Sequence, residues 1–131
     1  MRVARETLFV LGGAALLAAG CGDGGGDGGA EPQVVGTTVP GAAEVEVEAF
    51  DFGYSPDPVE IPANETVNLL MRVTAGGHNL RIEGTDLQFP IVEEGDAVVG
   101  ALTVAEPGDH RMVCTVPGHE AAGMVATLRV G

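Results

Sequence analysis

Three side chains that bind soft metal ions lie close together near the carboxyl end of the chain, in the segment CTVPGHEAAGM. Cys114 supplies a thiol, His119 supplies an imidazole five residues later, and Met124 supplies a thioether after five more. Thiolate and thioether sulfur are soft ligands and imidazole is a borderline one, and copper accepts all three. Zinc and iron sites rarely use methionine, so the spacing predicts a copper site on one short loop.

A mononuclear type 1 copper site needs a second imidazole, because one Cys and two His form its near-trigonal plane and a weak Met lies on the axis. His110 is four residues before the cysteine on one extended strand, about 13 Å away and too far to share an ion. His78 follows a Gly-Gly pair at the start of another strand and is free to approach the loop. We therefore expect the ligands to be His78, Cys114, His119 and Met124.

Each of these residues also has a plainer explanation. Met124 could fill the core, which is the commoner fate of a methionine, Cys114 could be an inert buried thiol, and His78 could hydrogen-bond at a strand end. A cysteine with a histidine can also form a thiol nucleophile, but the sequence shows no base or oxyanion arrangement. The three histidines of the chain leave none for the second copper of a copper enzyme. The combined arrangement favours a metal site, and we expect no enzymatic activity.

The segments that carry these residues alternate polar and apolar side chains, which is the pattern of half-buried strands. Turns rich in proline and glycine separate them, and the set predicts a β-sandwich or barrel. The alternation changes phase at residues 48–50, which predicts a bulge or a strand end there. Residues 84–97 fit a loop, a short helix or an irregular strand. The predicted strands are 44–49, 59–62, 66–73, 78–83, 98–104, 110–114 and 124–130.

The first 20 residues have the layout of a secretory signal peptide. Arg2 and Arg5 precede an apolar run of about 12 residues, which is shorter than the roughly 20 that a membrane span needs. Small residues then lead into Cys21, and this ending resembles a bacterial lipoprotein signal, in which Cys21 would carry the lipid. A plain signal peptide with a chance cysteine is the alternative.

Residues 21–43 are rich in glycine and poor in large side chains, so we expect a flexible linker. A Gly-rich chain of this length has an r.m.s. span of about 25 Å. Together with a lipidated cysteine, the linker would tether a domain formed by residues 44–131 to the outer face of the cytoplasmic membrane.

The predicted domain is strongly acidic. It has four arginines against fifteen acidic residues, a formal charge of −11, and the chain contains no lysine. This charge excludes nucleic acid binding and would attract a basic partner. Cys114 is the only cysteine of the domain, so a metal is a more plausible stabiliser than an internal disulfide. We expect a monomer.

Four features together resemble the cupredoxin superfamily, to which plastocyanin and azurin belong. They are His-Asn at 78–79, Pro-Gly before the cysteine strand, the C-x4-H-x4-M loop and the closing strand after the methionine. The resemblance covers nearly all of residues 44–131. It implies a Greek-key β-sandwich of about seven to eight strands, the four copper ligands named above and one-electron transfer. It also implies that Asn79 hydrogen-bonds near Thr115 and braces the ligand loop, as outer partners do in metal sites.

The sequence departs from this family in two places. The strand before the cysteine often has Tyr or Phe, whereas His110, Met112 and Val113 stand here, and we interpret His110 as structural. The loop has a single cysteine, whereas the binuclear copper centre of oxidase subunits needs two, so we expect those subunits to be excluded as relatives.

The predicted function is electron transfer to or from an unidentified redox partner outside the cytoplasmic membrane. Small uncharged residues around His119, within 117–123, predict the docking surface. The alternative is a copper carrier or buffer, or a cupredoxin-like module for metal uptake. Besides Met124 the domain has only Met71 and Met112, both in strand patterns, which favours electron transfer.

Overall fold

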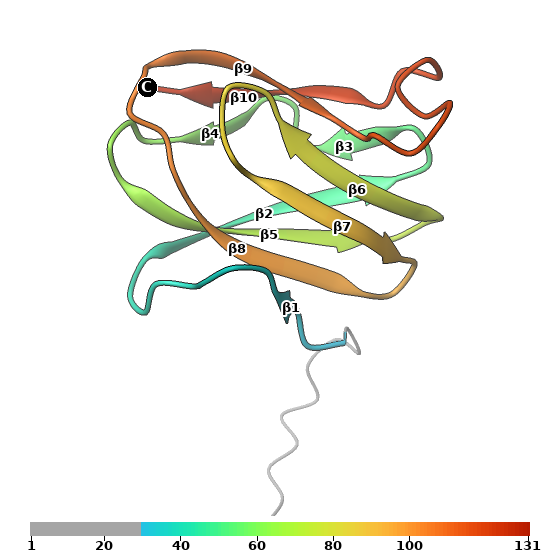
Figure 1. The fold of residues 1–131 in the computed structure, drawn as a ribbon, viewed down its shortest axis with the longest axis horizontal. Helices are drawn as coiled ribbons and strands as arrows, with labels where there is room; N and C mark the ends of the chain where they lie inside the picture. Colours follow the sequence, from blue (N-terminus) through green and yellow to red (C-terminus); the bar gives the residue numbers. More distant parts are fainter. Residues whose placement is uncertain (1–29) are drawn as a thin grey trace, which may run out of the picture.

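The computed structural model describes residues 30–131, which form two five-stranded sheets packed face to face (Figure 1). The predicted signal peptide and Cys21 lie outside the described residues. The prediction of an all-β sandwich is confirmed, with ten strands in the described part of the chain rather than seven or eight. Within residues 30–131, no helix is long and apolar enough to cross a lipid bilayer.

The two sheets are built from strands that alternate between them along the chain. The chain passes from one sheet to the other five times before the final β9–β10 pair, which is the connectivity of a Greek-key sandwich. The first sheet has the order β1 (Gln33–Val34), β8 (Ala97–Thr103), β5 (Thr66–Val73), β2 (Ala43–Phe50), β3 (Gly53–Ser55). The second has the order β4 (Val59–Ile61), β10 (Val125–Val130), β9 (Gly108–Val113), β6 (Gly77–Ile82), β7 (Gln88–Glu93).

The core lies between the sheets and follows the alternation of the strands. Every second residue of a strand points to the same face, and the inward residues of both sheets are apolar. Their removal from water is the main force that holds the sheets together. Fully buried examples are Val47, Leu69 and Met71 from the first sheet and Leu80, Met112 and Leu128 from the second.

The phase change near residue 50 is a strand end, as the sequence allowed. β2 ends at Phe50, which pairs with Gly53, so Asp51 and Phe52 form the turn of a tight hairpin. Phe52 has φ 66°, an uncommon backbone angle for a residue with a side chain. Because the chain reverses here, the apolar residues on the two sides of the turn need not share one phase.

Residues 84–97, which the sequence left open, contain a strand. β7 pairs antiparallel with β6, and the register shifts between His78 and Leu80. Phe89 is buried in the core, whereas Pro90 and Ile91 are exposed. β7 lies at the edge of its sheet, the place where a strand tolerates proline. Proline and an exposed isoleucine interrupt the alternation, which explains why the pattern was indistinct.

The end of the predicted linker differs from expectation, because it lies against the first sheet. β1 pairs in parallel with β8, and the amide of Val35 donates to the Val99 carbonyl at 2.9 Å. The Asn68 side chain exchanges two hydrogen bonds of 2.9 Å with the backbone of Val39. Without this segment β8 would be an open sheet edge with unpaired backbone groups. Residues 33–39 are therefore bound to the domain, and residues 21–29 lie outside the described part.

Gly100 offers a test of this docked segment. A Cβ there would lie 2.8 Å from the Val35 carbonyl oxygen and 3.2 Å from Phe89 Cε1. We predict that Gly100→Ala lowers the free energy of unfolding by about 1–3 kcal/mol, the range for overpacking. Hydrogen exchange should speed up more at the amides of Val35 and Ala101 than at the amide of Ala126 in the second sheet, which reports the global loss of stability. Unchanged exchange at Val35 would contradict the docking.

Candidate metal centre

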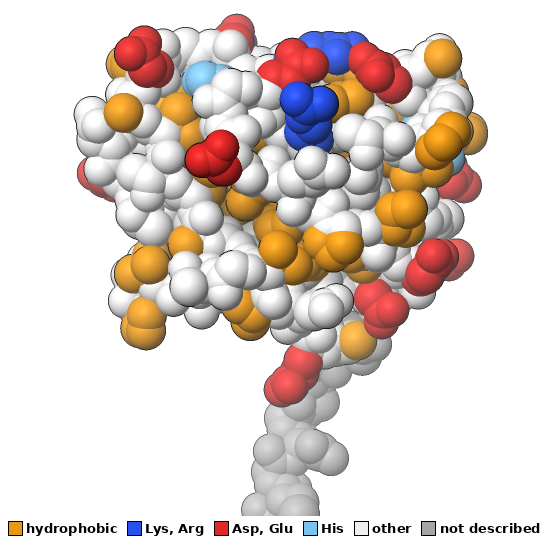
Figure 2. Space-filling model, in the orientation of Figure 1, with side chains coloured by type: hydrophobic (Ala, Val, Ile, Leu, Met, Phe, Trp, Pro, Cys, Tyr) orange, Lys and Arg blue, Asp and Glu red, His pale blue; other side chains and the backbone are white. Residues whose placement is uncertain are grey.

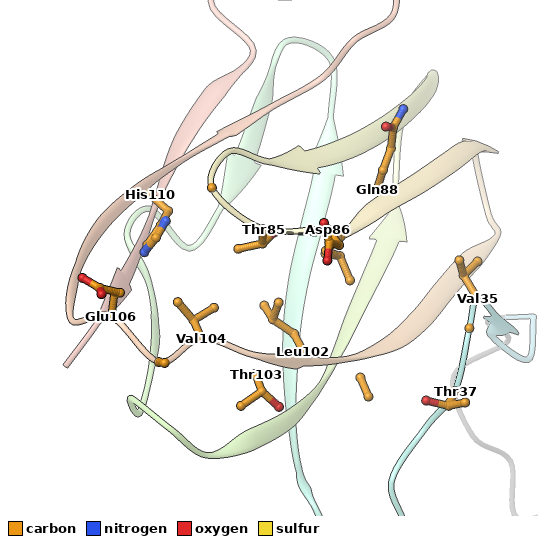
Figure 3. Close-up of a pocket in the computed structure, with 15 residues that line it drawn as sticks. Val35, Thr37, Thr85, Asp86, Gln88, Leu102, Thr103, Val104, Glu106 and His110 are labelled. Atoms are coloured by element: carbon orange, nitrogen blue, oxygen red, sulfur yellow. Dashed lines mark hydrogen bonds between the residues drawn. The ribbon is translucent and has the colours of Figure 1, made fainter.

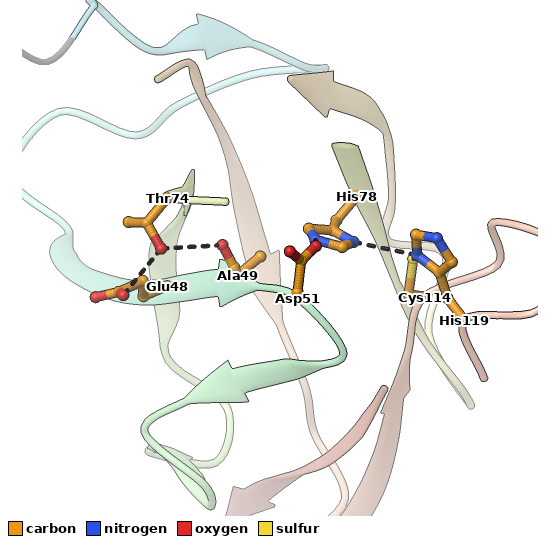
Figure 4. A network of polar contacts seen from close by, with 7 residues as sticks. All are labelled: Glu48, Ala49, Asp51, Thr74, His78, Cys114 and His119. Carbon is orange, nitrogen blue, oxygen red and sulfur yellow. Dashed lines mark hydrogen bonds and ion pairs between the residues drawn. The ribbon is translucent and has the colours of Figure 1, made fainter. Parts of the chain in front are cut away.

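Three of the four predicted ligands meet at one end of the sandwich. His78 comes from the start of β6, whereas Cys114 and His119 come from the loop between β9 and β10. Nδ1 of His78 lies 3.2 Å from Nδ1 of His119, which lies 3.5 Å from Sγ of Cys114 (Figure 4). The three ligand atoms are all within 4.8 Å of one another. His78 and Cys114 are fully buried, and His119 is partly exposed.

Met124, the fourth predicted ligand, closes the base of the same loop. Its amide donates to the His119 carbonyl at 3.0 Å, and its carbonyl accepts from the Cys114 amide at 3.3 Å. Its side chain is fully buried. Between these bonds the chain makes consecutive turns in which Gly118 and Gly123 have φ of 85° and 102°, angles that favour glycine. The loop is thus compact. Cys114 and Met124 lie at its two ends, and His119 lies in its middle.

Asn79 and Thr115 are joined across the two ligand-bearing segments, the contact that the family resemblance implied. The Asn79 side chain donates to Thr115 Oγ1 at 2.6 Å, and its oxygen accepts from the Thr115 amide at 2.7 Å. Asn79 follows His78 and Thr115 follows Cys114. These two bonds therefore fix the distance between the segments that carry the ligands.

Tyr54 adds a third brace that the sequence did not reveal. Its buried hydroxyl donates to the Asn79 carbonyl at 2.6 Å. Burial raises the pKa of Tyr54, and the charge of the Cys114 thiolate raises it further. The hydroxyl therefore stays protonated and keeps its hydrogen bond to the Asn79 carbonyl.

Arg111 ties the outer side of the loop to the neighbouring strands. It contacts the Glu120 carboxylate at 2.6 Å and the Glu83 carboxylate at 3.2 Å. The bond to Glu120, and then the bond to Glu83, raise the pKa of Arg111. Because all three side chains are exposed, we assign these pairs a small share of stability.

The β2–β3 turn supplies two further residues to the centre. The Phe52 ring lies edge-on to the His119 ring, with centroids 5.5 Å apart and an interplanar angle of 86°. Asp51 Oδ1 lies 3.5 Å from Nε2 of His78. The phase change in the sequence indicated the end of β2, but nothing in it placed this turn against the ligand loop.

His110 lies outside the ligand cluster, in agreement with its interpretation as structural. Its Nδ1 is 3.1 Å from the Glu83 carbonyl oxygen. It lines an open groove of about 610 Å³ together with Asp86, Leu102 and Glu106 (Figure 3). Among the described residues, no metal-ligand group of three includes the acidic residues of this groove.

The cluster fits a copper ion in its chemistry and its surroundings. A thiol and two imidazoles are the equatorial set of a type 1 site, and their ligand atoms converge on one point. The buried methionine lies beside them in the same loop. A soft ligand set of this kind at the end of a β-sandwich defines a type 1 copper-like centre.

The comparison with protein families agrees with this class. The family model of copper-binding proteins of the plastocyanin/azurin family matches residues 41–131, and the chain belongs to this family. The match begins three residues before the domain boundary that we expected from the sequence.

Sequence relatives include cytochrome c oxidase subunit 2 from Thermus thermophilus, which is 32% identical over 84 residues. The match covers 63% of this chain and 60% of that protein. A second subunit 2 sequence from the same species is also 32% identical, with 48% of its length covered. The chain therefore spans about half to three fifths of these relatives. The expectation that the single loop cysteine excludes oxidase subunits as relatives is wrong, because these sequences match. Cys114 is nevertheless the only cysteine among residues 30–131, and the binuclear copper centre needs two.

Solved structures with the same fold include auracyanins. Auracyanin B superposes with a TM-score of 0.63 at 25% identity, covering 79% of this chain and 96% of that one. The dithionite-reduced auracyanin from Roseiflexus castenholzii gives a TM-score of 0.62 at 18% identity, covering 70% and 99%. At 18% identity the likeness concerns the fold alone.

The Asn79–Thr115 brace can be tested in the metal-free protein. We predict that Asn79→Ala lowers the free energy of unfolding by about 2–3 kcal/mol, because it removes two hydrogen bonds and leaves partners unsatisfied. Asn68→Ala is the matched control, since Asn68 also makes two side-chain bonds to a distant backbone segment but lies away from the centre. Denaturant titrations and copper affinities should show a larger loss for Asn79→Ala in both. Equal effects of the two variants would contradict the bracing role.

The assignment of the thiolate and of the second histidine has a spectroscopic test. We predict that Cys114→Ser abolishes the intense visible band of the copper-loaded protein, because that band arises from the thiolate–copper bond. His110→Ala should leave the band unchanged, since His110 lies outside the cluster. A spectrum that persists in Cys114→Ser, or is lost in His110→Ala, would overturn the assignment.

Proposed function

We propose that the protein carries single electrons outside the cytoplasmic membrane, with one type 1 copper at His78, Cys114, His119 and Met124. The observation that supports this most is the convergence of a buried thiol and two imidazoles. Membership of a copper-binding family supports the choice of ion. The name of the auracyanin A structure describes that protein as a "blue" copper protein, and its TM-score to this chain is 0.57.

The copper, when bound, supplies a one-electron couple between Cu(II) and Cu(I). The protein contributes the rest. Cys114 gives up its proton on metal binding, because the thiolate is the ligand. The braces from Asn79 and Tyr54 hold the ligand segments in place. A rigid ligand set needs little rearrangement between oxidation states, which favours rapid transfer. Since no bond to a substrate is made or broken, we propose a carrier and not an enzyme.

The exposed edge of His119 is the proposed electron port. His119 is the only partly exposed residue of the three-ligand cluster. Exposed small residues of the loop and the half-exposed ring of Phe52 surround it. This surface offers a partner a closely approachable contact of small side chains around the imidazole, bordered by the exposed ion pair of Glu120 and Arg111.

Charge supports a basic redox partner. Acidic side chains are spread along the margins of the face in Figure 2, and the basic ones gather near its upper edge. The net negative charge of the domain would attract a positively charged protein towards the electron port over a long range. We propose that the protein acts as a monomer in this encounter.

The signal layout supports export, and the Gly-Cys ending supports a lipid on Cys21. Both features lie outside the described residues. Since residues 33–39 are bound to the domain, the segment between Cys21 and the first bound residue is shorter than the linker predicted from the sequence, and we propose that this segment joins the domain to the outer face of the membrane.

The alternative is a copper carrier or buffer. A protein that hands copper on would present further soft ligands at its surface, yet the side chains of Met71, Met112 and Met124 are all fully buried. Burial of the ligands favours retention of the ion in both oxidation states.

Retention of copper separates the two functions. We predict that the copper-loaded protein, reduced by ascorbate beside a moderate-affinity Cu(I) chelator, keeps its ion and regains full colour on reoxidation. Asn79→Ala serves as a comparison in which a looser loop should lose copper faster. Transfer of most of the copper from the wild-type protein to the chelator within minutes would contradict the electron-carrier proposal and favour the copper carrier.

A further inference from the structure

The outer nitrogen of His78 is in an unusual state. Nε2 is fully buried and is the one buried side-chain nitrogen or oxygen, among the described residues, without a hydrogen bond. Buried polar groups are nearly always satisfied, so an orphan needs an explanation. The acceptor that faces it is Asp51 Oδ1, 3.5 Å away. Figure 4 shows Asp51 on the side of the His78 ring opposite Cys114 and His119.

The backbone leaves room for this approach at Gly76. A Cβ at that position would lie 2.5 Å from Asp51 Oδ1 and 3.0 Å from His78 Nε2, and Gly76 has φ 75°. No residue with a side chain fits there without moving one of the two groups. Glycine therefore permits the carboxylate and the imidazole to face each other.

Hydrogen bonds hold the two segments that carry this pair. The amide of Thr74, shortly before Gly76, donates to the Ala49 carbonyl at 2.9 Å. The Thr74 hydroxyl donates to Glu48 Oε1 at 3.0 Å (Figure 4). The end of β2 and the loop before β6 are thus joined next to Asp51, which holds the backbone of both residues of the pair, although the Asp51 side chain itself is 63% exposed.

The position of the Asp51 carboxylate beside Nε2 favours one of the two tautomers of His78. A neutral imidazole has one N–H and one lone pair, and a metal ligand must present the lone pair. The 3.2 Å contact between the two Nδ1 atoms is satisfied whichever ring donates. An ionised carboxylate is acceptor-only, so Asp51 favours the proton on Nε2. Nδ1 of His78 then carries the lone pair towards the ligand cluster.

We propose that Asp51 is a positioning residue for His78: its carboxylate accepts the Nε2 proton, fixes the metal-binding tautomer and lowers the reduction potential of the copper. Such outer partners raise the basicity of a ligand, and their loss typically costs about 10–100-fold in metal affinity. A negative charge beside the ligand favours the more highly charged Cu(II). The redox part of this inference rests on the proposed function, whereas the tautomer part concerns the metal-free protein.

Three variants test the proposal at constant pH. Asp51→Asn keeps a side-chain acceptor and removes the charge, and Asp51→Ala removes both. Glu65→Gln removes the same charge from an exposed residue that precedes β5, at the end away from residues 74–77. The eight residues of β5 span about 26 Å, so Glu65 is a matched control for net charge.

The first readout is the tautomer of His78 in the metal-free protein, measured by ¹⁵N NMR of the imidazole nitrogens. We expect the Nε2–H form in the wild type, Asp51→Asn and Glu65→Gln, and a mixture of both forms in Asp51→Ala. A tautomer ratio in Asp51→Ala equal to that of the wild type would overturn the positioning role.

The second readout is the reduction potential of the copper-loaded proteins. We expect the ratio of Cu(II) to Cu(I) affinity to fall about tenfold in Asp51→Asn, which is about 59 mV for a one-electron couple, and to change far less in Glu65→Gln. Equal potentials in these two variants would refute the electrostatic part. If the wild type forms no thiolate–copper band, the proposed function has failed, and the tautomer measurement alone decides the role of Asp51.

Discussion

Two imidazole nitrogens and a thiol sulfur lie within 4.8 Å of one another, although His78 and His119 are 41 residues apart in the chain. Placing these ligand atoms together in the protein interior is unfavourable by itself, because burying polar atoms without full hydrogen bonding costs free energy. The sandwich must supply that energy through its core. The position of β6 beside β9 in the second sheet is what brings the two ligand-bearing segments together. The other contacts at this end of the molecule hold these two segments in place.

The braces around the ligands explain how the fold meets this need. Asn79 joins the two segments by side-chain bonds, Tyr54 bonds to the backbone of Asn79, and the backbone of Met124 closes the ligand loop. The side-chain braces act on residues beside the ligands rather than on the ligands themselves. The backbone beside the ligands is fixed, and their metal-binding atoms face one another. A site arranged in this way suits electron transfer, in which the ion changes charge and the protein should not move.

Much of this site could be predicted because its chemistry is local in sequence. Cys114, His119 and Met124 share one loop. His110 lies on the same extended strand as Cys114 and is too far along it to share an ion, which left His78 as the second histidine ligand. The contacts that could not be predicted join segments through space. Asp51 and Phe52 reach the ligands only because the β2–β3 turn folds against the loop. Residues 33–37 bind to the first sheet through backbone hydrogen bonds, which amino-acid composition does not predict. Strand β7 was not predicted because Pro90 interrupts its alternating pattern.

We infer that the fold itself arranges the ligand atoms and that the metal does not need to gather them. Crystal structures of the metal-free and the copper-loaded protein, grown under the same conditions, test this inference. We expect one copper ion bound by His78, Cys114 and His119, whose ligand atoms differ by less than about 0.5 Å between the two structures, the tolerance of a preorganised site. A copper ion bound elsewhere, or a metal-free structure in which Cys114 or His119 has moved out of the cluster, would contradict it.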